Sequence, residues 1–329
     1  MKKIFLAVLA VAALASCAKE ETLTLPQGDA IAFGDAFVDN STKAIYEEAD
    51  DIQGFTVFGN VVATGSANTP VALYGNTGAT VARTKDGNTA ALGAAWYCNV
   101  VRYWTPLCTF NFAAIANHDG VTVENGIPTA IKYTVANDDT NDLIYGVASA
   151  TTDPSCAPSG SVNDAKVVAF TMEHLLSRVQ LSFENGVNTA DDAYSYAISN
   201  ITVSTWEKGI YTIGAATPWA KDGEDLVSLT YAAVETVAEG AIVASTTANV
   251  VIPGSSVTVS FTYELKLNGA TIYTGTVSGT IPNSVTLVKG HSYNLKAVLT
   301  LENEIQFTVS NEENSLAAWT SPATEVTVQ

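Results

Sequence analysis

Apolar and polar residues alternate along most of this chain, and β-branched or aromatic side chains occupy many of the apolar positions. The clearest runs of this kind are residues 55–58, 179–183, 198–203, 257–263 and 305–309. A period of two residues is what an antiparallel strand needs when one face is buried and the other is in water. Turn-forming pairs such as Asn125-Gly126 and Asn268-Gly269 separate the runs at short spacing. The pattern predicts an all-β fold made of antiparallel β-sandwiches.

Helical periodicity is scarce. Residues 173–178 could form a single helical turn, and residues 232–241 tolerate a helix without presenting a clear apolar stripe. A βαβ architecture would need strands that alternate with amphipathic helices, and the sequence does not show that alternation. We therefore expect helices to contribute little to the fold.

The length of 329 residues corresponds to roughly two domains of about 150 residues each. The most linker-like segment is 151–161, which is rich in Pro, Ser, Thr and Gly, and a new apolar run begins at Val167. We predict an N-terminal domain over 44–165 and a C-terminal domain over 166–329. A second polar stretch, 185–192, is an alternative place for the boundary.

The amino terminus has the layout of a lipoprotein signal peptide. Residues 1–3 carry two lysines, residues 4–13 are apolar, and Leu14-Ala15-Ser16-Cys17 is a small-residue cleavage site that ends in cysteine. The apolar run, 4–16, is shorter than the roughly 20 residues that a transmembrane helix needs. We predict that residues 1–16 are removed and that acyl chains on Cys17 anchor the protein to the outer membrane, exposed at the cell surface.

Acidic residues outnumber basic ones by 33 to 15, and the formal net charge is −18. Such a chain would repel a phosphate backbone, so nucleic-acid binding through a basic surface is excluded. Only 15% of the residues are charged, against roughly 25% in average soluble domains. The surface must therefore be covered largely by Thr, Ser, Asn and Gly.

Three further cysteines, Cys98, Cys108 and Cys156, would be in a compartment that allows disulfides. We predict a hairpin between residues 96–104 and 108–112, with its turn near 105–107. In that register the two cysteines of the hairpin face other positions, 113 and 103, and do not pair with each other. A bond from Cys156 to either of them stays open.

Residues able to do chemistry are scattered along the chain. The three histidines lie in separate segments without metal-binding spacing, and we interpret them as structural or solvated: His118, His174 and His291. The acidic clusters 138–142 and 191–192, including Asp142, lack the spacing of a calcium loop and are interpreted as solvated loop charges. A distant pair of carboxylates for glycoside hydrolysis stays open. We expect no catalytic residues, no metal and no cofactor.

Aromatic side chains could in principle stack on sugars. The five tryptophans are Trp96, Trp104, Trp206, Trp219 and Trp319. Most of them are expected to pack in β-sandwich cores, where aromatic rings supply buried area. Trp219 is in the most loop-like context, residues 218–223, and is the candidate ligand platform.

The order of several short motifs along the chain resembles the fimbrillin family, the lipoprotein subunits of type V pili on gut and oral anaerobes. The matching stretches are residues 30–33, 41–44, 55–59, 96–113, 142–146, 170–181, 251–253, 289–293 and 305–307. The match runs from the lipoprotein signal to Trp319. The resemblance implies two transthyretin-like antiparallel β-sandwich domains in tandem, and a structural or adhesive pilus subunit that is not an enzyme.

The resemblance also implies polymerisation by strand exchange. A surface trypsin-like protease would remove residues 17–43, whose Ile31 and Phe33 fill a groove on one strand face. The tail strand of another subunit, with Val326 and Val328 inward, would then occupy the groove. Cleavage in the best-known members follows arginine, and this chain has none before Arg83. We therefore predict the cut between Lys43 and Ala44.

The expected partners are other pilus subunits, the outer membrane through the lipid on Cys17, the trypsin-like protease, and host or bacterial surface ligands. After processing, the protein would be part of the fimbrium. The alternative is a surface lipoprotein that does not polymerise, either a pilus anchor or tip component or a glycan-binding protein.

Overall fold

The protein consists of strands. The computed structural model describes residues 28–38, 52–65, 69–85, 88–89, 96–137, 141–163, 166–189, 193–281, 287–301, 306–310 and 326–328. Every regular element in these ranges is a β-strand, which confirms the all-β prediction. They contain no helix long and apolar enough to cross a lipid bilayer. Residues 173–178, which could have formed one helical turn, instead end strand β13 and begin strand β14. Residues 232–241 contain strand β19.

The N-terminal half is built on one strongly curved nine-stranded sheet. Seven strands follow the order β1-β13-β11-β8-β2-β4-β7, and β3 and β12 pair with β2 and β11. Their bounds are β1 (Ala32–Val38), β2 (Gly54–Ala63), β3 (Val71–Ala72), β4 (Ala79–Ala82), β7 (Tyr97–Cys98), β8 (Cys108–Ala116), β11 (Ile144–Thr152), β12 (Pro158–Gly160) and β13 (Val167–His174). β8 is central and is antiparallel to β2 and to β11 over eight residue pairs each. A short separate ribbon joins β5 (Thr84–Lys85) and β6 (Asn88–Thr89).

The two faces of this sheet enter different cores. Phe110, Phe112 and Ala114 of β8 pack with aromatic residues of the same curved sheet. The alternate residues Ala113 and Ile115 enter a larger core that continues into the C-terminal half. Because side chains alternate across a strand, β8 is buried on both sides and reads as a nearly continuous apolar run.

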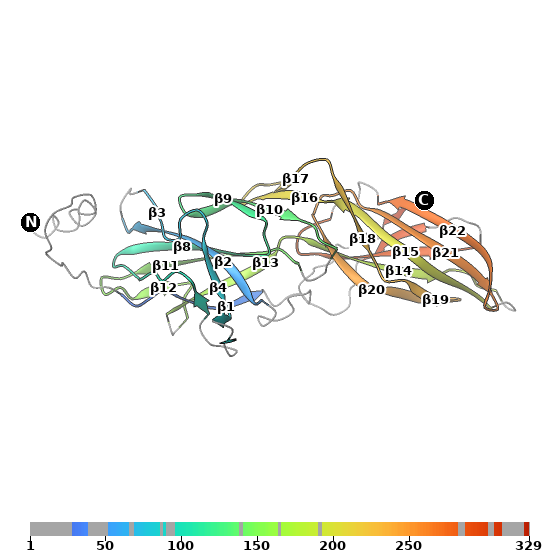
Figure 1. Ribbon diagram of the computed structural model, residues 1–329, viewed down its shortest axis with the longest axis horizontal. Coiled ribbons are helices and arrows are strands. Elements are labelled where there is room, and N and C mark those ends of the chain that lie inside the picture. The colour runs from blue at the N-terminus through green and yellow to red at the C-terminus, as the bar shows by residue number, and fades with distance from the viewer. Residues whose placement is uncertain are drawn as a thin grey trace, which may run out of the picture.

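A second, four-stranded sheet joins the two halves of the chain. Its order is β17-β16-β10-β9, with bounds β9 (Gly120–Glu124), β10 (Ile127–Thr134), β16 (Lys208–Thr212) and β17 (Trp219–Lys221). β10 of the N-terminal half pairs with β16 of the C-terminal half, so that Ile131 faces Tyr211. This sheet lies over the middle of the elongated molecule (Figure 1). The two halves therefore share backbone hydrogen bonds as well as a core.

The C-terminal half is a sandwich of two sheets. One has the order β20-β14-β23-β24-β25, and the other has the order β18-β15-β21-β22, with β19 also paired to β15. Their bounds are β14 (Ser177–Asn185), β15 (Tyr194–Trp206), β18 (Leu226–Thr230), β19 (Val234–Ala238), β20 (Ile242–Val251), β21 (Thr258–Leu267), β22 (Ala270–Thr280), β23 (Ser292–Leu299), β24 (Gln306–Ser310) and β25 (Val326–Val328). Phe183 and Phe261 meet edge to face between the sheets, with ring centroids 5.1 Å apart.

The chain crosses between the two halves at Leu175 and Leu176, beyond the predicted boundary at 165/166. β13 pairs with β1 and β11, so it belongs to the N-terminal sheet, whereas β14 pairs with β20 and β23. The linker-like segment 151–161 holds the end of β11, a turn and β12, which folds back onto β11 as a hairpin. Strand pairing therefore puts the change from one half to the other after β13, whereas the Pro- and Ser-rich composition marks a turn within the N-terminal sheet.

The hairpin predicted between 96–104 and 108–112 is wrong. β7 contains only two residues and pairs with β4, opposite Val81 and Ala82, whereas β8 pairs with β2 and β11. Neither Cys98 nor Cys108 is in a disulfide, and Cys156 forms none with them. Burial raises the pKa of the Cys98 thiol, which therefore stays protonated at neutral pH.

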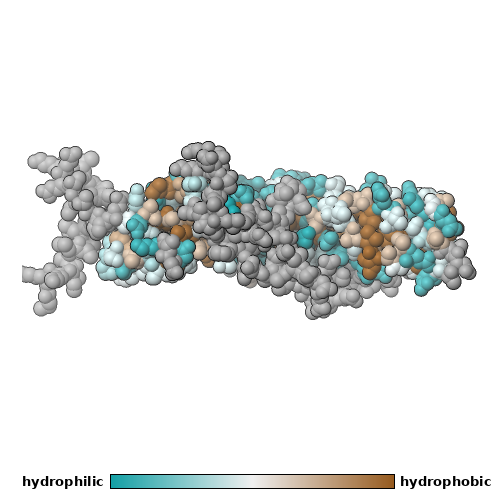
Figure 2. Space-filling view, turned by 90° about the horizontal axis from the view of Figure 1, so that it is seen from below, coloured by the Kyte–Doolittle hydropathy of each residue, from teal (hydrophilic) through white to brown (hydrophobic). Residues whose placement is uncertain are grey.

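The surface in view in Figure 2 is mostly hydrophilic or near neutral where residues are described, with hydrophobic side chains gathered in one spot on each half. Large exposed apolar residues include Tyr97, Val101 and Tyr103 in the N-terminal half and Ile272 and Tyr273 in the C-terminal half.

Candidate functional site

The first described strand closes the curved N-terminal sheet. On one side, β1 runs parallel to β13, with Phe33 opposite Val168. On the other side, residues 28–33 run antiparallel to residues 96–104, through isolated bridges from Ala30 to Tyr103 and from Phe33 to Trp96. The strand thus lies between two neighbours that would otherwise have unpaired edges.

Backbone hydrogen bonds tie this strand to residues 96–104. The Ile31 N–H donates to the Arg102 carbonyl at 2.7 Å, and the Trp96 N–H donates to the Phe33 carbonyl at 3.1 Å. The Trp104 N–H donates to the Asp29 carbonyl at 3.1 Å. Removing the strand would expose these donors and acceptors to water, together with those of β13.

Two alternate side chains of the segment, Ile31 and Phe33, fill the interior. Phe33 is 0% exposed and Ile31 is 5% exposed. Four rings surround Phe33, with centroid distances of 5.9 Å to Phe112, 6.0 Å to Phe170, 6.4 Å to Tyr74 and 6.5 Å to Phe55. This is the burial that a groove-filling strand requires, and the release of the segment remains a prediction.

At its start, the segment passes very close to neighbouring residues. A Cβ atom on Gly28 would lie 2.6 Å from the Trp104 carbonyl oxygen and 2.7 Å from the Cys156 Cβ atom, so no other residue fits without displacing the backbone. Nearby, Lys166 and Asp29 form an exposed ion pair at 2.9 Å. Such exposed pairs add little to stability, so this contact contributes little to holding the strand in place.

An open cleft of about 480 Å³ lies beside the first strand, between that strand and residues 96–101. Its lining includes Ile31, Trp96 and Cys98. The guanidinium of Arg83 lies over the Trp96 ring, 5.0 Å from the centroid. Trp96 and Trp104 are both buried, in agreement with the packing role predicted for most tryptophans.

The last described strand, β25, forms one edge of a C-terminal sheet. It is antiparallel to β24 over three residue pairs, with Val326 opposite Val309 and Val328 opposite Phe307. The side chains of Val326 and Val328 lie outside the described part of the chain. Cys17, Lys43 and Ala44 also lie outside the described residues.

Trp219, predicted to be in a loop, lies in strand β17 instead. Its indole N–H donates to the Leu175 carbonyl at 2.8 Å, and its ring meets Tyr211 edge to face at 5.3 Å. The side chain is half-buried against the shared core. The geometry gives Trp219 a packing role where the chain crosses between the halves, and its use as a ligand platform stays a prediction.

Asp142 was misjudged from the sequence. It is 0% exposed, and its Oδ2 atom is hydrogen bonded to Nδ1 of His174, which is also buried. The Asn117 side-chain amide donates to the Asp142 backbone carbonyl at 2.8 Å. A carboxyl group buried this deeply needs a hydrogen-bond partner such as His174 to offset its lost hydration. The apolar residues that follow Asp142 are the signal that could have indicated burial.

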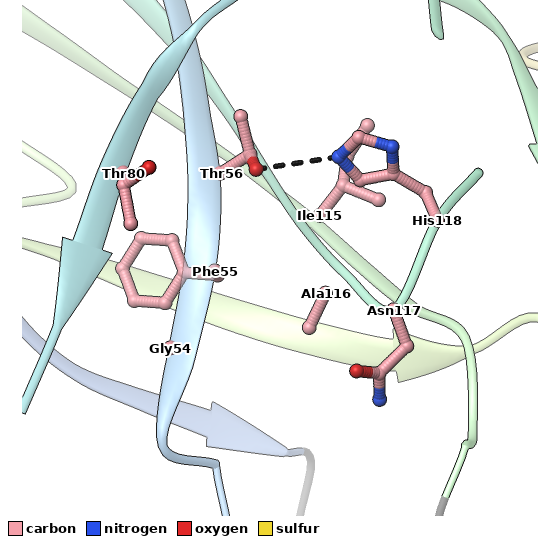
Figure 3. A pocket seen from close by; sticks show the side chains of 8 residues that line it. All are labelled: Gly54, Phe55, Thr56, Thr80, Ile115, Ala116, Asn117 and His118. Carbon is pink, nitrogen blue, oxygen red and sulfur yellow. Dashed lines mark hydrogen bonds between the residues drawn. The ribbon is translucent and has the colours of Figure 1, made fainter. Parts of the chain in front are cut away.

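His118 lines a small open cleft of about 370 Å³ between β2, β4 and the end of β8 (Figure 3). Its Nε2 atom lies 3.2 Å from the Thr56 hydroxyl. Burial lowers the pKa of His118, partly offset by the nearby Asp119 carboxylate. None of the described residues that line this cleft is a carboxylate, so the Thr56 hydroxyl and the His118 ring have no acidic side chain beside them to orient the ring as in a catalytic triad. Among the described residues, no three His, Cys, Asp or Glu side chains come close enough to hold a metal ion.

Comparison with known proteins identifies the family. The family model described as Fimbrillin-like matches residues 42–312. The chain belongs to the fimbrillin-like family. Among solved structures, this fimbrillin-like chain is similar to a fimbrial protein from Bacteroides vulgatus, with a TM-score of 0.54 and 15% identity over 88% of this chain and 99% of that one. It is also similar to the fimbrial anchor protein Mfa2 from Porphyromonas gingivalis, with a TM-score of 0.37 and 9% identity over 89% of this chain and 100% of that one. No curated protein matches the chain significantly.

Proposed function

We propose that this protein is a structural or adhesive subunit of a surface pilus, exported as a lipoprotein on Cys17 and polymerised by strand exchange. The observation that carries the proposal is the position of the segment 28–38, held between β13 and residues 96–104 with Phe33 inside a cage of four rings. A strand in this position closes a core and can be replaced by another strand of similar pattern.

The predicted cut after Lys43 suits the topology. Lys43 precedes β2, so cleavage there would separate β1 from the rest of the sheet and leave β2 in place. Arg83 is a poor alternative because it is buried and follows β2. A cut at Arg83 would detach a strand that pairs with β8 over eight residue pairs.

The tail is a suitable donor. Val326 and Val328 are two residues apart, as Ile31 and Phe33 are, so they can occupy the same two pockets from one strand face. β25 is paired with β24 over only three residue pairs at the edge of its sheet. It can therefore leave at a smaller cost than an interior strand. A removed first strand and a donated tail strand would link subunits head to tail.

Membership of the fimbrillin-like family and the similarity to a fimbrial protein support a pilus or adhesin role over an enzyme. A subunit of this kind would be exposed at the cell surface. A pilus anchor would retain its first strand and its lipid, and would end a fibre instead of extending it.

The test is N-terminal sequencing and intact mass of the protein sheared from the surface of producing cells, beside unboiled gels. We expect a chain that begins at Ala44 within a detergent-resistant ladder. Lys43→Gln should abolish both the new terminus and the ladder, whereas Lys132→Gln, at an exposed lysine of β10, should change neither. A lipidated monomer that begins at Cys17 in the unaltered strain would contradict the proposal.

A further inference from the structure

A second cleft lies on the C-terminal half, away from the first-strand groove. It is open, measures about 640 Å³, and is lined by Asn137, Thr230, Tyr231, Ala232, Thr246, Thr247 and Asn249. This volume is in the range of small-molecule sites in proteins. The lining comes from three separate parts of the chain: the segment after β10, the end of β18 and the middle of β20.

The polar groups of the cleft are amides and hydroxyls. In a chain with 33 acidic residues, none of the seven lining residues is Asp, Glu, Lys, Arg or His. The only ionisable side chain is the Tyr231 phenol, whose pKa is raised by burial, so it is neutral at physiological pH. Its hydroxyl donates to the Val179 carbonyl at 3.0 Å. The described residues that line the cleft therefore offer hydrogen bonds without a charged side chain.

Hydrogen bonds hold these groups in place. The Asn137 amide donates to the Thr230 hydroxyl at 2.7 Å and accepts from the Thr230 N–H at 2.7 Å. Asn249 is buried and donates to the Thr230 carbonyl at 3.2 Å. The Thr247 hydroxyl accepts from the Ala232 N–H at 3.2 Å. The polar groups are thus oriented in advance, which lowers the entropic cost of binding.

A bulge in β20 brings two of the threonines to the cleft. Ser182 faces Ala244 and Gln180 faces Ala248, so three residues of β20 oppose one residue of β14. The Ser245 hydroxyl at this bulge donates to the Ala232 carbonyl at 2.9 Å, and Thr246 is exposed. Bulges commonly redirect side chains beside binding sites.

One lining residue, Thr230, is also the first member of a row of hydroxyl-bearing residues that crosses the sheet β18-β15-β21-β22. Thr230 of β18 faces Thr202 of β15, which faces Ser260 of β21, which faces Ser278 of β22. The adjacent row is Ser228, Ser204, Thr258 and Thr280. Because neighbouring strands lie about 4.8 Å apart, each row of four residues is about 14 Å long across the strands. Neither row carries a charged side chain.

We propose that this cleft and the hydroxyl rows beside it bind a neutral glycan of several sugar units. A neutral sugar presents many hydroxyl groups and no charge, and it matches a surface of oriented amides and hydroxyls. An anionic glycan would meet no basic side chain in the lining and would be repelled by the acidic chain as a whole. The lining offers no exposed aromatic face, so binding to one subunit should be weak.

The experiment is saturation-transfer NMR on the purified uncut protein, kept in a detergent without sugar headgroups. The probes are millimolar maltotetraose, cellotetraose, mannotetraose and chitotetraose, with an acidic oligogalacturonate as the charged comparison. At least one neutral probe should receive saturation, and the acidic one should not. Loss of signal from all four neutral probes, or a signal from the acidic one alone, would overturn the proposal.

Two variants locate the site. Ala232→Leu fills the cleft from a half-buried position and should reduce the affinity at least tenfold. Thr246→Val removes one exposed hydroxyl with little change in shape and should reduce the affinity about threefold to tenfold, as expected for one neutral hydrogen bond. Thr122→Val, at an exposed position of β9, is the matched control and should leave binding unchanged. Equal binding by the unaltered protein and Ala232→Leu would place the sugar elsewhere and refute the assignment.

Discussion

Phe33→Ala is the substitution that most directly tests the role of the first strand. The ring is 0% exposed and lies among Phe55, Phe112, Phe170 and Tyr74, which come from separate segments of the N-terminal sheet. Removing a buried phenylalanine ring costs about 3–5 kcal/mol, and less where the surroundings can collapse into the cavity. Four large rings from separate segments of the chain cannot close the gap easily. We expect a loss of about 4 kcal/mol in the free energy of unfolding of the uncut protein.

The same substitution should leave the assembled polymer unaffected. If residues 17–43 depart on cleavage, Phe33 is absent from the polymer, and only the uncut protein can lose stability. The cleaved segment should also leave the groove faster, by up to roughly 10³-fold for a loss of about 4 kcal/mol. Urea denaturation followed by tryptophan fluorescence measures the first effect, and the release of a labelled segment after cleavage measures the second.

Phe183→Ala is the matched control. Phe183 is buried in the C-terminal sandwich against Phe261, so its loss should destabilise the uncut protein and the polymer alike. If Phe33→Ala lowers the free energy of unfolding by less than about 1 kcal/mol, the four rings around Phe33 do not stabilise the first strand as we infer. Equal destabilisation of the uncut protein and the polymer by Phe33→Ala would show that the first strand stays in the fibre.

Two further predictions concern stability. Gly146→Ala would place a Cβ atom 2.6 Å from the Thr171 carbonyl oxygen of the neighbouring strand, so thermal denaturation should show a loss of about 1–3 kcal/mol in the free energy of unfolding. The control is Gly120→Ala, which should be close to neutral because no atom lies within 4 Å of the added Cβ. Equal effects of the two substitutions would refute the close approach at Gly146. Burial lowers the pKa of His118 in the folded protein, so the unfolded chain binds the proton more readily. The stability that His118 contributes is therefore fully present above about pH 6.5 and is lost as the pH falls through the lowered pKa of the folded protein. Urea midpoints between neutral and acidic pH should therefore fall less steeply in His118→Gln, and an unchanged slope would contradict the burial of the ring.

Several features of the fold could be predicted from local pattern. Alternating runs such as 179–183 and 257–263 are strands β14 and β21, because a half-buried strand imposes its period on the sequence directly. The choice of Ile31 and Phe33 came from the family resemblance, and their spacing of two residues places them on one strand face. Both are buried in the structure.

Strand partners could not be predicted in the same way. Residues 96–104 are rich in aromatic and β-branched residues and adjoin another apolar run, so a local hairpin was expected. Instead, they receive the first strand, from residues about seventy positions earlier in the chain, and β7 pairs with β4. The side chains that pack where these partners meet, such as the rings around Phe33, come from segments far apart in the sequence.

The burial of Asp142 has a similar explanation. In the sequence it follows Asp138 and Asp139, which suggested a solvated acidic loop. In the fold it meets His174 at the end of β13, a residue far away in the chain. Whether a carboxylate is solvated or buried depends on the partner that compensates its desolvation, and that partner is supplied by tertiary contacts.

Local periodicity and composition are enough to predict the strand content, the apolar face of each strand and an acidic, hydroxyl-rich surface. The position of the first strand between β13 and residues 96–104, the sheet shared by the two halves and the cleft between β18 and β20 depend on contacts between distant segments. Backbone hydrogen bonds are the same for every residue, so strand pairing is selected by packing among side chains that are distant in sequence.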